Sequence, residues 1–468
     1  MCRKKIRLRH FLHQICLPTR LSVFGQRIHL NRPFAMATTM VGMMLGVYVA
    51  FQVVVQTLEE QVGNTAYSLG TSSSSQTEFS MDFNSTRNVY AVIFDAGSTG
   101  SRMHVYHFRK NQDWNVELVH ETFQQVKPGL SNYSADPQKG AESLHNMLTS
   151  AIGEVPVKLH SETPIVLKAT AGLRLLPHGA AENLLNEVSV LFRKTMFHQV
   201  ERGVEILGGS EEGIFSWVTV NYLEGAFYKS GETVAALDLG GGSTQITFVP
   251  KEKRTIESAP HSYLTSTNLF SKNYTLYTHS YLGLGLMSAR FRVLGGTENE
   301  DDGASTSSET LRSACLPPDR EFSWVHHGGK KFNVGGLPES ESGYSQCYAT
   351  VQPLVTSSVA TVPELSQQKV YAFSYFFDRA VDSDLIDEVN GGSVLVTDFQ
   401  EAAQRACDSP DIDDPFLCMD LTYIYSLLHN GYGLSLRSSI HVLKQIKKIE
   451  VSWTLGAAFQ VLTSIGHL

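Results

Sequence analysis

The strongest constraint on the fold is a short pattern that occurs twice in the chain. Both "YAVIFDAGST" and "VAALDLGGGST" consist of an apolar run, an aspartate, glycine and a serine-threonine pair, and a second alternating apolar run follows each. Such stretches are typical of two strands joined by a turn. Turns of this composition are common. Two copies headed by Asp95 and Asp238, a domain length apart, nevertheless predict a duplicated protein whose two lobes present the turns across a cleft.

The chain around these turns alternates between predicted strands and helices. Helical spacing occurs in "DPQKGAESLHNMLTSAI", "AAENLLNEVSVLFRKTM" and "EEGIFSWVTVNYL", whereas "TPIVLKAT" is predicted to be a short buried strand and "VEILGGS" a strand and loop. This alternation predicts an α/β body. The apolar stretch "VSWTLGAAFQVLTSI" is too short to span a bilayer, so we expect a helix that packs on the body. The acidic stretch at 295–310 is expected to be a solvated loop.

The composition of the two turns indicates phosphate binding. Glycines let backbone N–H groups converge, and converging N–H groups with hydroxyls form a cradle for phosphate oxygens. An aspartate would repel a phosphate, but it can hold a divalent cation that bridges to one. The chain has neither the P-loop pattern nor a Gly-x-Gly-x-x-Gly that opens a helix after a first strand. The turns therefore predict a metal-assisted clamp for two neighbouring phosphates.

A general base for this clamp is expected near the start of a predicted helix. Glu211 and Glu212 follow a Gly-Gly loop. Acidic residues in a first helical turn usually only interact with the helix dipole, but beside phosphate turns one of them can activate a water. Thr170 and Arg174 follow a predicted strand and are candidates for binding phosphate or orienting water, with packing as an equal alternative.

The N-terminal region predicts a membrane anchor. Residues 1–58 contain no acidic residue, and residues 35–55 carry no charge over a span long enough to cross a bilayer. Basic residues precede the span and acidic ones follow it, which favours a cytosolic N-terminus. A cleaved signal peptide is the weaker alternative. We expect a cytosolic tail (1–34), a signal-anchor (35–55), a Ser-rich stalk (56–88), lobe I (89–206, completed by a C-terminal helix at 448–468) and lobe II (207–447).

Cysteines and sequons agree with a body outside the cytosol. Four of the six cysteines lie in the body, where local pairing would join Cys315 with Cys347 and Cys407 with Cys418, although three pairings are possible. The sequons at Asn84, Asn132 and Asn273 are glycosylation acceptors in such a compartment. A formal net charge of -8 gives no support for nucleic-acid binding.

Five stretches together resemble a known family. "IFDAGSTGSR", "KATAGLRLLP", "GGSEEGIFSWVTVNYL", "ALDLGGGSTQITF" and "YAFSYFFDRA" are similar, in order, to the apyrase motifs of the ectonucleoside triphosphate diphosphohydrolases. The resemblance covers the body from about Val89 to the C-terminus. It implies the two-lobed fold of actin, sugar kinases and Hsp70, built from duplicated ribonuclease-H-like domains. It also implies a Ca²⁺ or Mg²⁺ cofactor, and it supports the two local disulfides.

The resemblance assigns roles to the residues that match these motifs. Asp95 would serve the metal, Asp238 would hold it through water, and Glu212, directly before glycine, would be the base. Thr170 and Gln245 would lie by the attacking water. The two phosphate cradles would be formed by Ser98, Thr99, Gly100 and Ser101, and by Gly240, Gly241, Gly242 and Ser243. Nucleobase recognition would involve aromatic residues among Tyr371, Tyr375, Phe376, Phe377 and Tyr423.

Within that family the chain is most similar to the small Golgi and secreted nucleoside diphosphatases, the CD39-like members five and six. "SYLGLGLMSAR", "AFSYFFD", "CMDLTY" and the single N-terminal anchor carry this similarity. It implies hydrolysis of GDP, UDP or IDP to the monophosphate and phosphate. It also implies a single-pass type II protein of the Golgi membrane with a lumenal catalytic body, or a form released by proteolysis.

Four alternatives remain open at this point. A broad-specificity triphosphate diphosphohydrolase would cleave ATP and GTP equally well. An exopolyphosphatase has similar turns but would cleave polyphosphate, and a kinase of the same fold would need an acceptor. A non-enzymatic nucleotide-binding glycoprotein would carry a degenerate clamp, which the presence of Asp95, Glu212, Asp238 and Ser243 disfavours. The sequence does not predict an oligomeric state.

Overall fold

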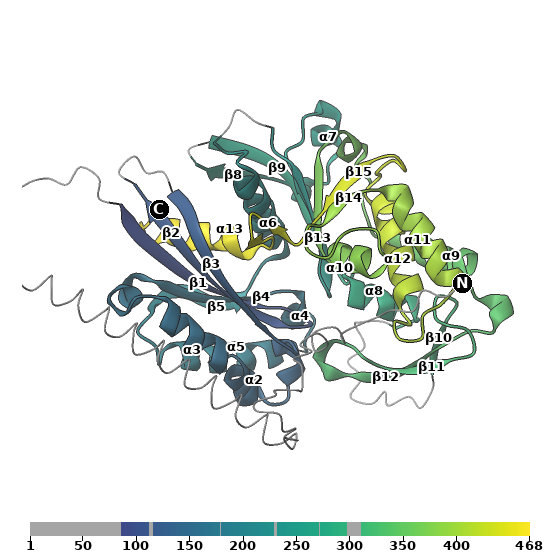
Figure 1. Ribbon diagram of the computed structural model, residues 1–468, viewed down its shortest axis with the longest axis horizontal. Coiled ribbons are helices and arrows are strands. Elements are labelled where there is room, and N and C mark those ends of the chain that lie inside the picture. The colour runs from purple at the N-terminus through teal and green to yellow at the C-terminus, as the bar shows by residue number, and fades with distance from the viewer. Residues whose placement is uncertain (1–85, 112–115, 178, 229–231, 271, 297–309) are drawn as a thin grey trace, which may run out of the picture. The chain divides into compact units, whose positions relative to one another are not determined.

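The computed structural model describes residues 86–468 except 112–115, 178, 229–231, 271 and 297–309 (Figure 1). The predicted tail and anchor, nearly all of the stalk, Asn84 and most of the acidic loop lie outside the described residues. Among the described residues, no helix combines the length and the apolar character that crossing a membrane requires. The described part is a mixed α/β fold with several sheets.

The first large sheet begins with a hairpin and ends with parallel strands. Its order is β3-β2-β1-β4-β5, with β1 antiparallel to β2 and parallel to β4. The strands are β1 (Arg87–Ala96), β2 (Ser101–Lys110), β3 (Val116–Val126), β4 (Pro164–Ala169) and β5 (His198–Ile206). The structure thus confirms the predicted strands in "TPIVLKAT" and "VEILGGS".

The second large sheet repeats this plan. Strands β9, β7, β6, β13 and β15 follow in the same order as β3, β2, β1, β4 and β5, and β13 is again parallel to β6. Two further strands, β8 and β14, extend its edges. The strands are β6 (Ala235–Leu239), β7 (Ser243–Phe248), β8 (Leu264–Leu269), β9 (Lys272–Leu282), β13 (Val370–Ser374), β14 (Gly392–Leu395) and β15 (Ser439–Val442). The repeated topology is that of a duplicated protein.

Helices cover both sheets because each has an apolar stripe to bury. The first sheet carries α2 (Pro137–Ser143), α3 (His145–Glu154), α4 (Ala171–Arg174) and α5 (Ala180–Phe192). In the described residues after β5, seven α-helices precede the last one: α6 (Gly209–Glu224), α7 (Lys253–Ser258), α8 (Leu286–Val293), α9 (Tyr344–Thr356), α10 (Tyr375–Asp382), α11 (Val396–Asp408) and α12 (Leu417–Ser426). Small strands complete the chain: β10 (Leu311–Ser313), β11 (Glu321–Val325), β12 (Lys331–Gly336), β16 (Gln445–Ile446) and β17 (Ile449–Glu450).

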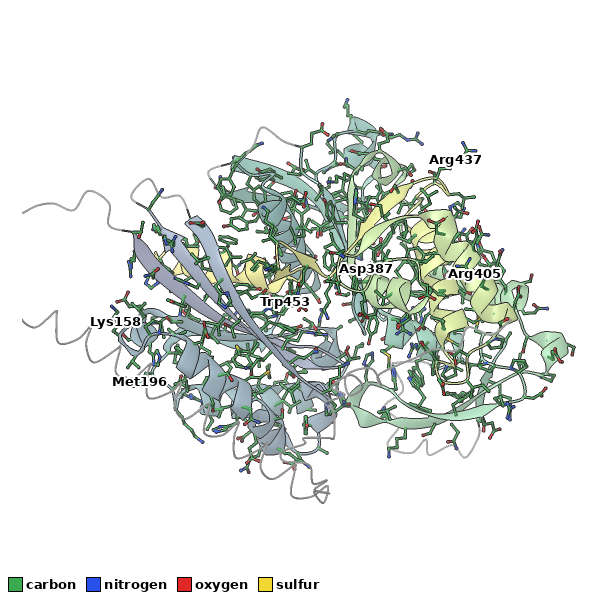
Figure 2. The ribbon with its side chains drawn as sticks, viewed as in Figure 1. Lys158, Met196, Asp387, Arg405, Arg437 and Trp453 are labelled. Carbon is green, nitrogen blue, oxygen red and sulfur yellow. A yellow bond between two sulfur atoms is a disulfide. The ribbon has the colours of Figure 1, made fainter. Side chains whose placement is uncertain are left out.

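A shared core lies between the two sheets. The last helix, α13 (Thr454–Ser464), packs with α6 and β1, and Trp217 and Phe459 are buried in this cluster. Trp453, which precedes α13, is also buried there (Figure 2). A Cβ added to Gly456 would lie 2.4 Å from the Phe215 oxygen, so only glycine allows the two helices to approach this closely. The predicted C-terminal helix that packs on the body is therefore confirmed.

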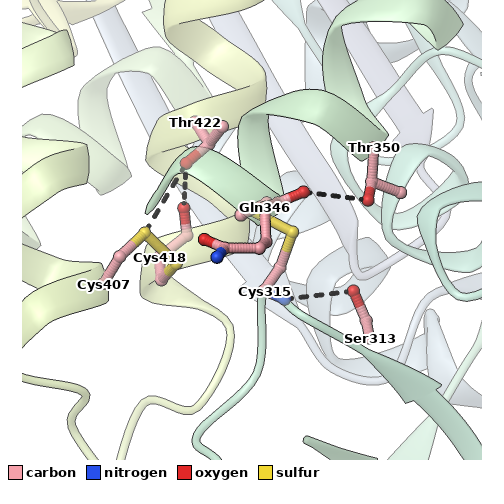
Figure 3. The surroundings of a disulfide bond; sticks show 8 residues. Ser313, Cys315, Gln346, Thr350, Cys407, Cys418 and Thr422 are labelled. Carbon is pink, nitrogen blue, oxygen red and sulfur yellow. Dashed lines mark hydrogen bonds between the residues drawn. A yellow bond between two sulfur atoms is a disulfide. The ribbon is translucent and has the colours of Figure 1, made fainter. Parts of the chain in front are cut away.

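Two disulfides strengthen the helical side of the second sheet. Cys315 pairs with Cys347 of α9, and Cys407 of α11 pairs with Cys418 of α12 (Figure 3). These are the two local pairs among the three possible pairings. The sulfurs of Cys347, Cys407 and Cys418 lie within 4.8 Å of one another, so the two disulfides are neighbours in one buried cluster.

Candidate functional site

The fold brings the two Gly/Ser/Thr turns into contact. The β1–β2 turn and the β6–β7 turn meet so closely that a Cβ on Gly241 would lie 2.2 Å from the Ser98 hydroxyl oxygen. The Ser131 hydroxyl donates to the Ser98 carbonyl at 3.3 Å and supports the first turn from behind. A side chain at residue 241 would displace the Ser98 hydroxyl, so glycine lets the two turns keep this contact.

Helix α8 holds the backbone of the second turn. Leu286 N donates to the Gly240 carbonyl, and Met287 N and Ser288 N both donate to the Gly241 carbonyl, at 2.9 to 3.1 Å. The first N–H groups of a helix lack partners within it, and here they take the turn's carbonyls. The turn is therefore fixed by the helix that follows β9.

Asp95 lies at the end of β1, nearly buried, with one oxygen paired and one free. Its Oδ2 accepts a hydrogen bond from Arg102 Nη1 at 3.0 Å, while its Oδ1 is buried and has no hydrogen-bond partner among the described residues. Burial raises the pKa of Asp95, and the charge of Arg102 opposes that rise. Arg102 stands directly opposite Asp95 on β2, a pairing that the hairpin register dictates.

Asp238 occupies the equivalent end of β6, and serines hold both of its oxygens. Ser374 Oγ donates to Oδ1 at 2.7 Å, and Ser216 Oγ donates to Oδ2 at 3.3 Å. Burial raises the pKa of Asp238 to about 6, an effect that the Ser374 hydrogen bond opposes. The two aspartates, equivalent in the duplication, thus have different partners.

Glu212 lies in the first turn of α6, and its carboxylate is buried. Its side chain forms a buried ion pair with Arg174, which lies at the end of α4. Burial raises the pKa of Glu212 to about 8; Arg174 opposes the rise, and the charges of Asp238 and Asp95 add to it. These mutual effects mean that the three carboxylates occupy one site.

Gln245 and Thr170 lie beside these carboxylates. Gln245 Nε2 donates to Ser243 Oγ and to Ser280 Oγ, each at 2.8 Å, while Gln245 Oε1 is buried without a hydrogen-bond partner among the described residues. Thr170 follows β4, and its N–H donates to the Ala96 carbonyl at 3.3 Å, which places it against the first turn. The free amide oxygen of Gln245 is an acceptor available to a water or a substrate.

The remaining residues of the predicted cradles lie at the same place. Ser101 Oγ is buried without a hydrogen-bond partner in the described part of the chain. Thr99 and Gly100 complete the first turn, and Gly242 and Ser243 complete the second, where Gly240 N donates to the Ser243 carbonyl at 3.0 Å.

The aromatic candidates for the nucleobase differ in exposure. Tyr371, Phe376, Phe377 and Tyr423 are all buried among core residues, and the Tyr423 hydroxyl donates to the Leu284 carbonyl at 2.5 Å. A base cannot stack on a ring that is almost completely buried. Tyr375 keeps a half-exposed side chain, because it begins α10 directly after β13.

The two sequons that the structure describes, at Asn132 and Asn273, also differ in exposure. Asn273 is exposed on β9, opposite Asn268 of β8. Asn132 is half-buried in the short helix η1 (Leu130–Tyr133), and its Oδ1 is a buried atom close to Gly329 of the turn η4 (His327–Gly329). Of these two sequons, Asn273 is therefore the more exposed.

Four residues that hold the site were not predicted from the sequence: Arg102, Ser216, Ser280 and Ser374. All four lie within quoted stretches: Arg102 in "IFDAGSTGSR", Ser216 in "GGSEEGIFSWVTVNYL", Ser280 in "SYLGLGLMSAR" and Ser374 in "YAFSYFFDRA". Position in a motif was therefore the available signal, but only the packing of α6 and β9 against β6 and β7 shows that Ser216 reaches Asp238 and that Ser280 reaches Gln245.

Comparison with known proteins agrees with this geometry. Residues 81–467 match the GDA1/CD39 (nucleoside phosphatase) family. The chain is 45% identical over 387 residues to the nucleoside diphosphate phosphatase ENTPD5 of Homo sapiens, which covers 82% of this chain and 89% of that protein. It is 40% identical over 382 residues to ectonucleoside triphosphate diphosphohydrolase 6 of Homo sapiens, covering 81% and 78%.

A solved structure shows the same fold. The crystal structure of nucleoside triphosphate hydrolases from Neospora caninum superposes with a TM-score of 0.58 at 14% identity, covering 88% of this chain and 98% of that one. The five motifs, the duplicated sheets and the sequence match over nearly the whole body lead to one conclusion. This chain belongs to the GDA1/CD39 (nucleoside phosphatase) family.

Proposed function

We propose that the protein is a nucleoside diphosphatase that hydrolyses GDP, UDP or IDP to the nucleoside monophosphate and phosphate. The observation that carries this proposal is the buried Glu212 carboxylate, paired with Arg174 beside two phosphate-type turns that touch each other. The name of the human relative, a nucleoside diphosphate phosphatase, supports the choice of substrate.

The residues of the cleft fit a divalent cation. Asp95 offers a buried, unpartnered carboxylate oxygen, and oxygen is the ligand that Ca²⁺ and Mg²⁺ prefer. Asp95 would hold the ion, and Asp238 would hold it through water because serine hydroxyls already occupy both of its oxygens. When bound, the ion supplies positive charge that neutralises the phosphate oxygens.

Glu212 acts as the general base on the attacking water. The ionised carboxylate accepts a proton from the water as the new oxygen–phosphorus bond forms, and the anhydride bond to the departing monophosphate breaks. Arg174 keeps Glu212 oriented and favours its ionised form. Gln245, through Oε1, and Thr170 position the water, and the two turns hold the phosphates with backbone N–H groups and hydroxyls.

Tyr375 is the aromatic residue that we assign to the nucleobase. It is the half-exposed member of the candidate set, and it adjoins Ser374, whose hydroxyl reaches Asp238. A base that stacks on Tyr375 would lie in the second lobe, next to the cation and the phosphates.

We further propose that the enzyme is a single-pass type II membrane protein of the Golgi. The uncharged span 35–55 would anchor it, and the paired cysteines of the body suit an oxidising lumen. A lumenal diphosphatase would remove the nucleoside diphosphates that glycosyl transfer releases.

Phosphate release from a panel of nucleotides tests the function. The full-length protein in detergent, with Ca²⁺ or Mg²⁺, should release phosphate from GDP or UDP faster than from ADP, GTP or ATP. Equal rates on triphosphates would replace the proposal with a broad nucleotide hydrolase, and release from polyphosphate alone would replace it with an exopolyphosphatase.

A further inference from the structure

Ser374 has a backbone conformation that serine rarely adopts. Its φ is 62° and its ψ is −128°, at the junction where β13 ends and α10 begins. These angles are those of the first central position of a type II′ turn, where glycine is usual because a Cβ is strained there. Glycine would fit this position without strain, so the presence of serine indicates a use for its hydroxyl.

The conformation directs the hydroxyl to a carboxylate of the site. Strand β13 is parallel to β6, with Phe373 opposite Asp238, so the residue after Phe373 emerges beside that aspartate. The Ser374 Oγ then donates to Asp238 Oδ1 at 2.7 Å, which is a short hydrogen bond between a hydroxyl and a carboxylate. Ser216 of α6 holds the other oxygen at 3.3 Å.

We propose that Ser374 is a positioning residue for the cation site, whose hydroxyl fixes the Asp238 carboxylate in the orientation that the cation requires. This inference rests on the proposed function, because it takes Asp238 as part of a metal site. The strained conformation of Ser374 persists because its neighbours are fixed on both sides: β13, which precedes it, is paired with β6, and α10 begins directly after it. Groups that orient metal-binding residues typically change metal affinity 10- to 100-fold when removed.

Two substitutions separate the hydroxyl from the strain. Ser374→Gly removes both, whereas Ser374→Ala removes the hydroxyl and keeps the strain. Without nucleotide, both variants should bind Ca²⁺ about tenfold more weakly than the wild type in isothermal titration calorimetry of the full-length protein. In the absence of metal, Ser374→Gly should unfold at a higher urea concentration than Ser374→Ala.

Asp384→Gly is the matched control. Asp384 also has a positive φ, of 58°, but it is exposed and follows the C-terminal end of α10, whereas Ser374 precedes its start. This variant should bind Ca²⁺ like the wild type. Ser216→Ala, which removes the longer hydrogen bond from an unstrained position in a helix, should weaken Ca²⁺ binding less than Ser374→Gly does.

Three results would overturn the inference. Wild-type affinity for Ca²⁺ in Ser374→Gly would show that the hydroxyl does not position Asp238. Equal weakening in Asp384→Gly would show that backbone flexibility alone explains the loss. If the wild-type protein binds neither Ca²⁺ nor Mg²⁺ and releases no phosphate, the metal site and the proposed function are both overturned. If the wild-type protein is active and binds metal, and Ser374→Gly binds metal equally well, only the inference is overturned.

Discussion

Glu211 and Glu212 are chemically identical neighbours that the fold places in different environments. Glu211 is exposed, and its carboxylate accepts the Gly208 N–H at 3.2 Å, which caps α6. Glu212 lies on another face of the helix, where it is buried and pairs with Arg174. Helix geometry separates adjacent side chains by about 100°, so one residue caps the helix and the other is available for catalysis.

This contrast gives a matched pair of substitutions. Glu212→Ala should reduce kcat about 10²- to 10⁴-fold, the usual contribution of a general base. Glu211→Ala should keep kcat nearly unchanged and lower the free energy of unfolding by about 1 kcal/mol through loss of the cap. Phosphate release and urea denaturation of both variants check this. Similar activity in the two variants would remove Glu212 from the role of base.

Glu212 also predicts how stability depends on pH. Its pKa rises from 4.5 to about 8 on folding, so the folded protein binds the proton more tightly than the unfolded chain. The stabilisation is complete below pH 4.5 and is lost as the pH rises to about 8. The free energy of unfolding of the metal-free protein should therefore fall across this range by a few kcal/mol, on the order expected for such a shift.

Glu212→Gln should remove most of that slope, because glutamine does not titrate. Urea denaturation of the metal-free wild type and variant at pH 6 and pH 8 compares the two slopes. The pKa of Asp238, raised to about 6, contributes a slope at lower pH that the variant should keep. Parallel curves between pH 6 and pH 8 would mean that Glu212 is not protonated in the folded, metal-free protein.

At the scale of elements, the sequence predicted where helices form better than it predicted which side chains are buried. The helix in "AAENLLNEVSVLFRKTM" is α5, whose apolar residues recur at helical spacing. The stretch "EEGIFSWVTVNYL" lies within α6, which is buried on nearly every side and so has no distinct apolar face. The sequence did not show which of the aromatic residues after β13 are buried in the core and which are exposed. Phe376 and Tyr375 are adjacent and similar, yet one is core and the other half-exposed, since aromatic rings serve both purposes. The conformation of Ser374 carries no sequence signal.

The disulfide between α11 and α12 gives a prediction at this scale. Replacing Cys407 and Cys418 together by serine should lower the free energy of unfolding by about 2 to 3 kcal/mol, because a short loop is no longer closed in the unfolded chain. The double variant is preferable to either single one, since a lone thiol would lie within 4.8 Å of the sulfur of Cys347 and could attack its disulfide. Urea denaturation measures the loss. An unchanged midpoint would show that this bond contributes no stability.

At the scale of the whole molecule, duplication explains why two turns so far apart in sequence form one site. Each sheet ends its first strand with an aspartate, and the shared core of α6, α13 and β1 holds the two sheets so that the turns meet. The hairpin pattern and its repetition were visible in the sequence. Arg174 and Glu212 were both candidates from the sequence, but their ion pair was not predicted, because it depends on the packing of the two halves.

Glycosylation tests the orientation of the entire chain across a membrane. If the body is lumenal, Asn273 should carry a glycan, because it is exposed on a hairpin, whereas Asn132 should not, because it is half-buried in η1, which packs against η4. In protein from secretory cells, Asn273→Gln should increase electrophoretic mobility by one glycan, and Asn132→Gln should leave it unchanged. Endoglycosidase treatment should abolish the difference between Asn273→Gln and the wild type. If endoglycosidase does not change the mobility of the wild-type protein, the body lies outside the secretory lumen. If Asn132→Gln changes the mobility, η1 is accessible before it packs against η4.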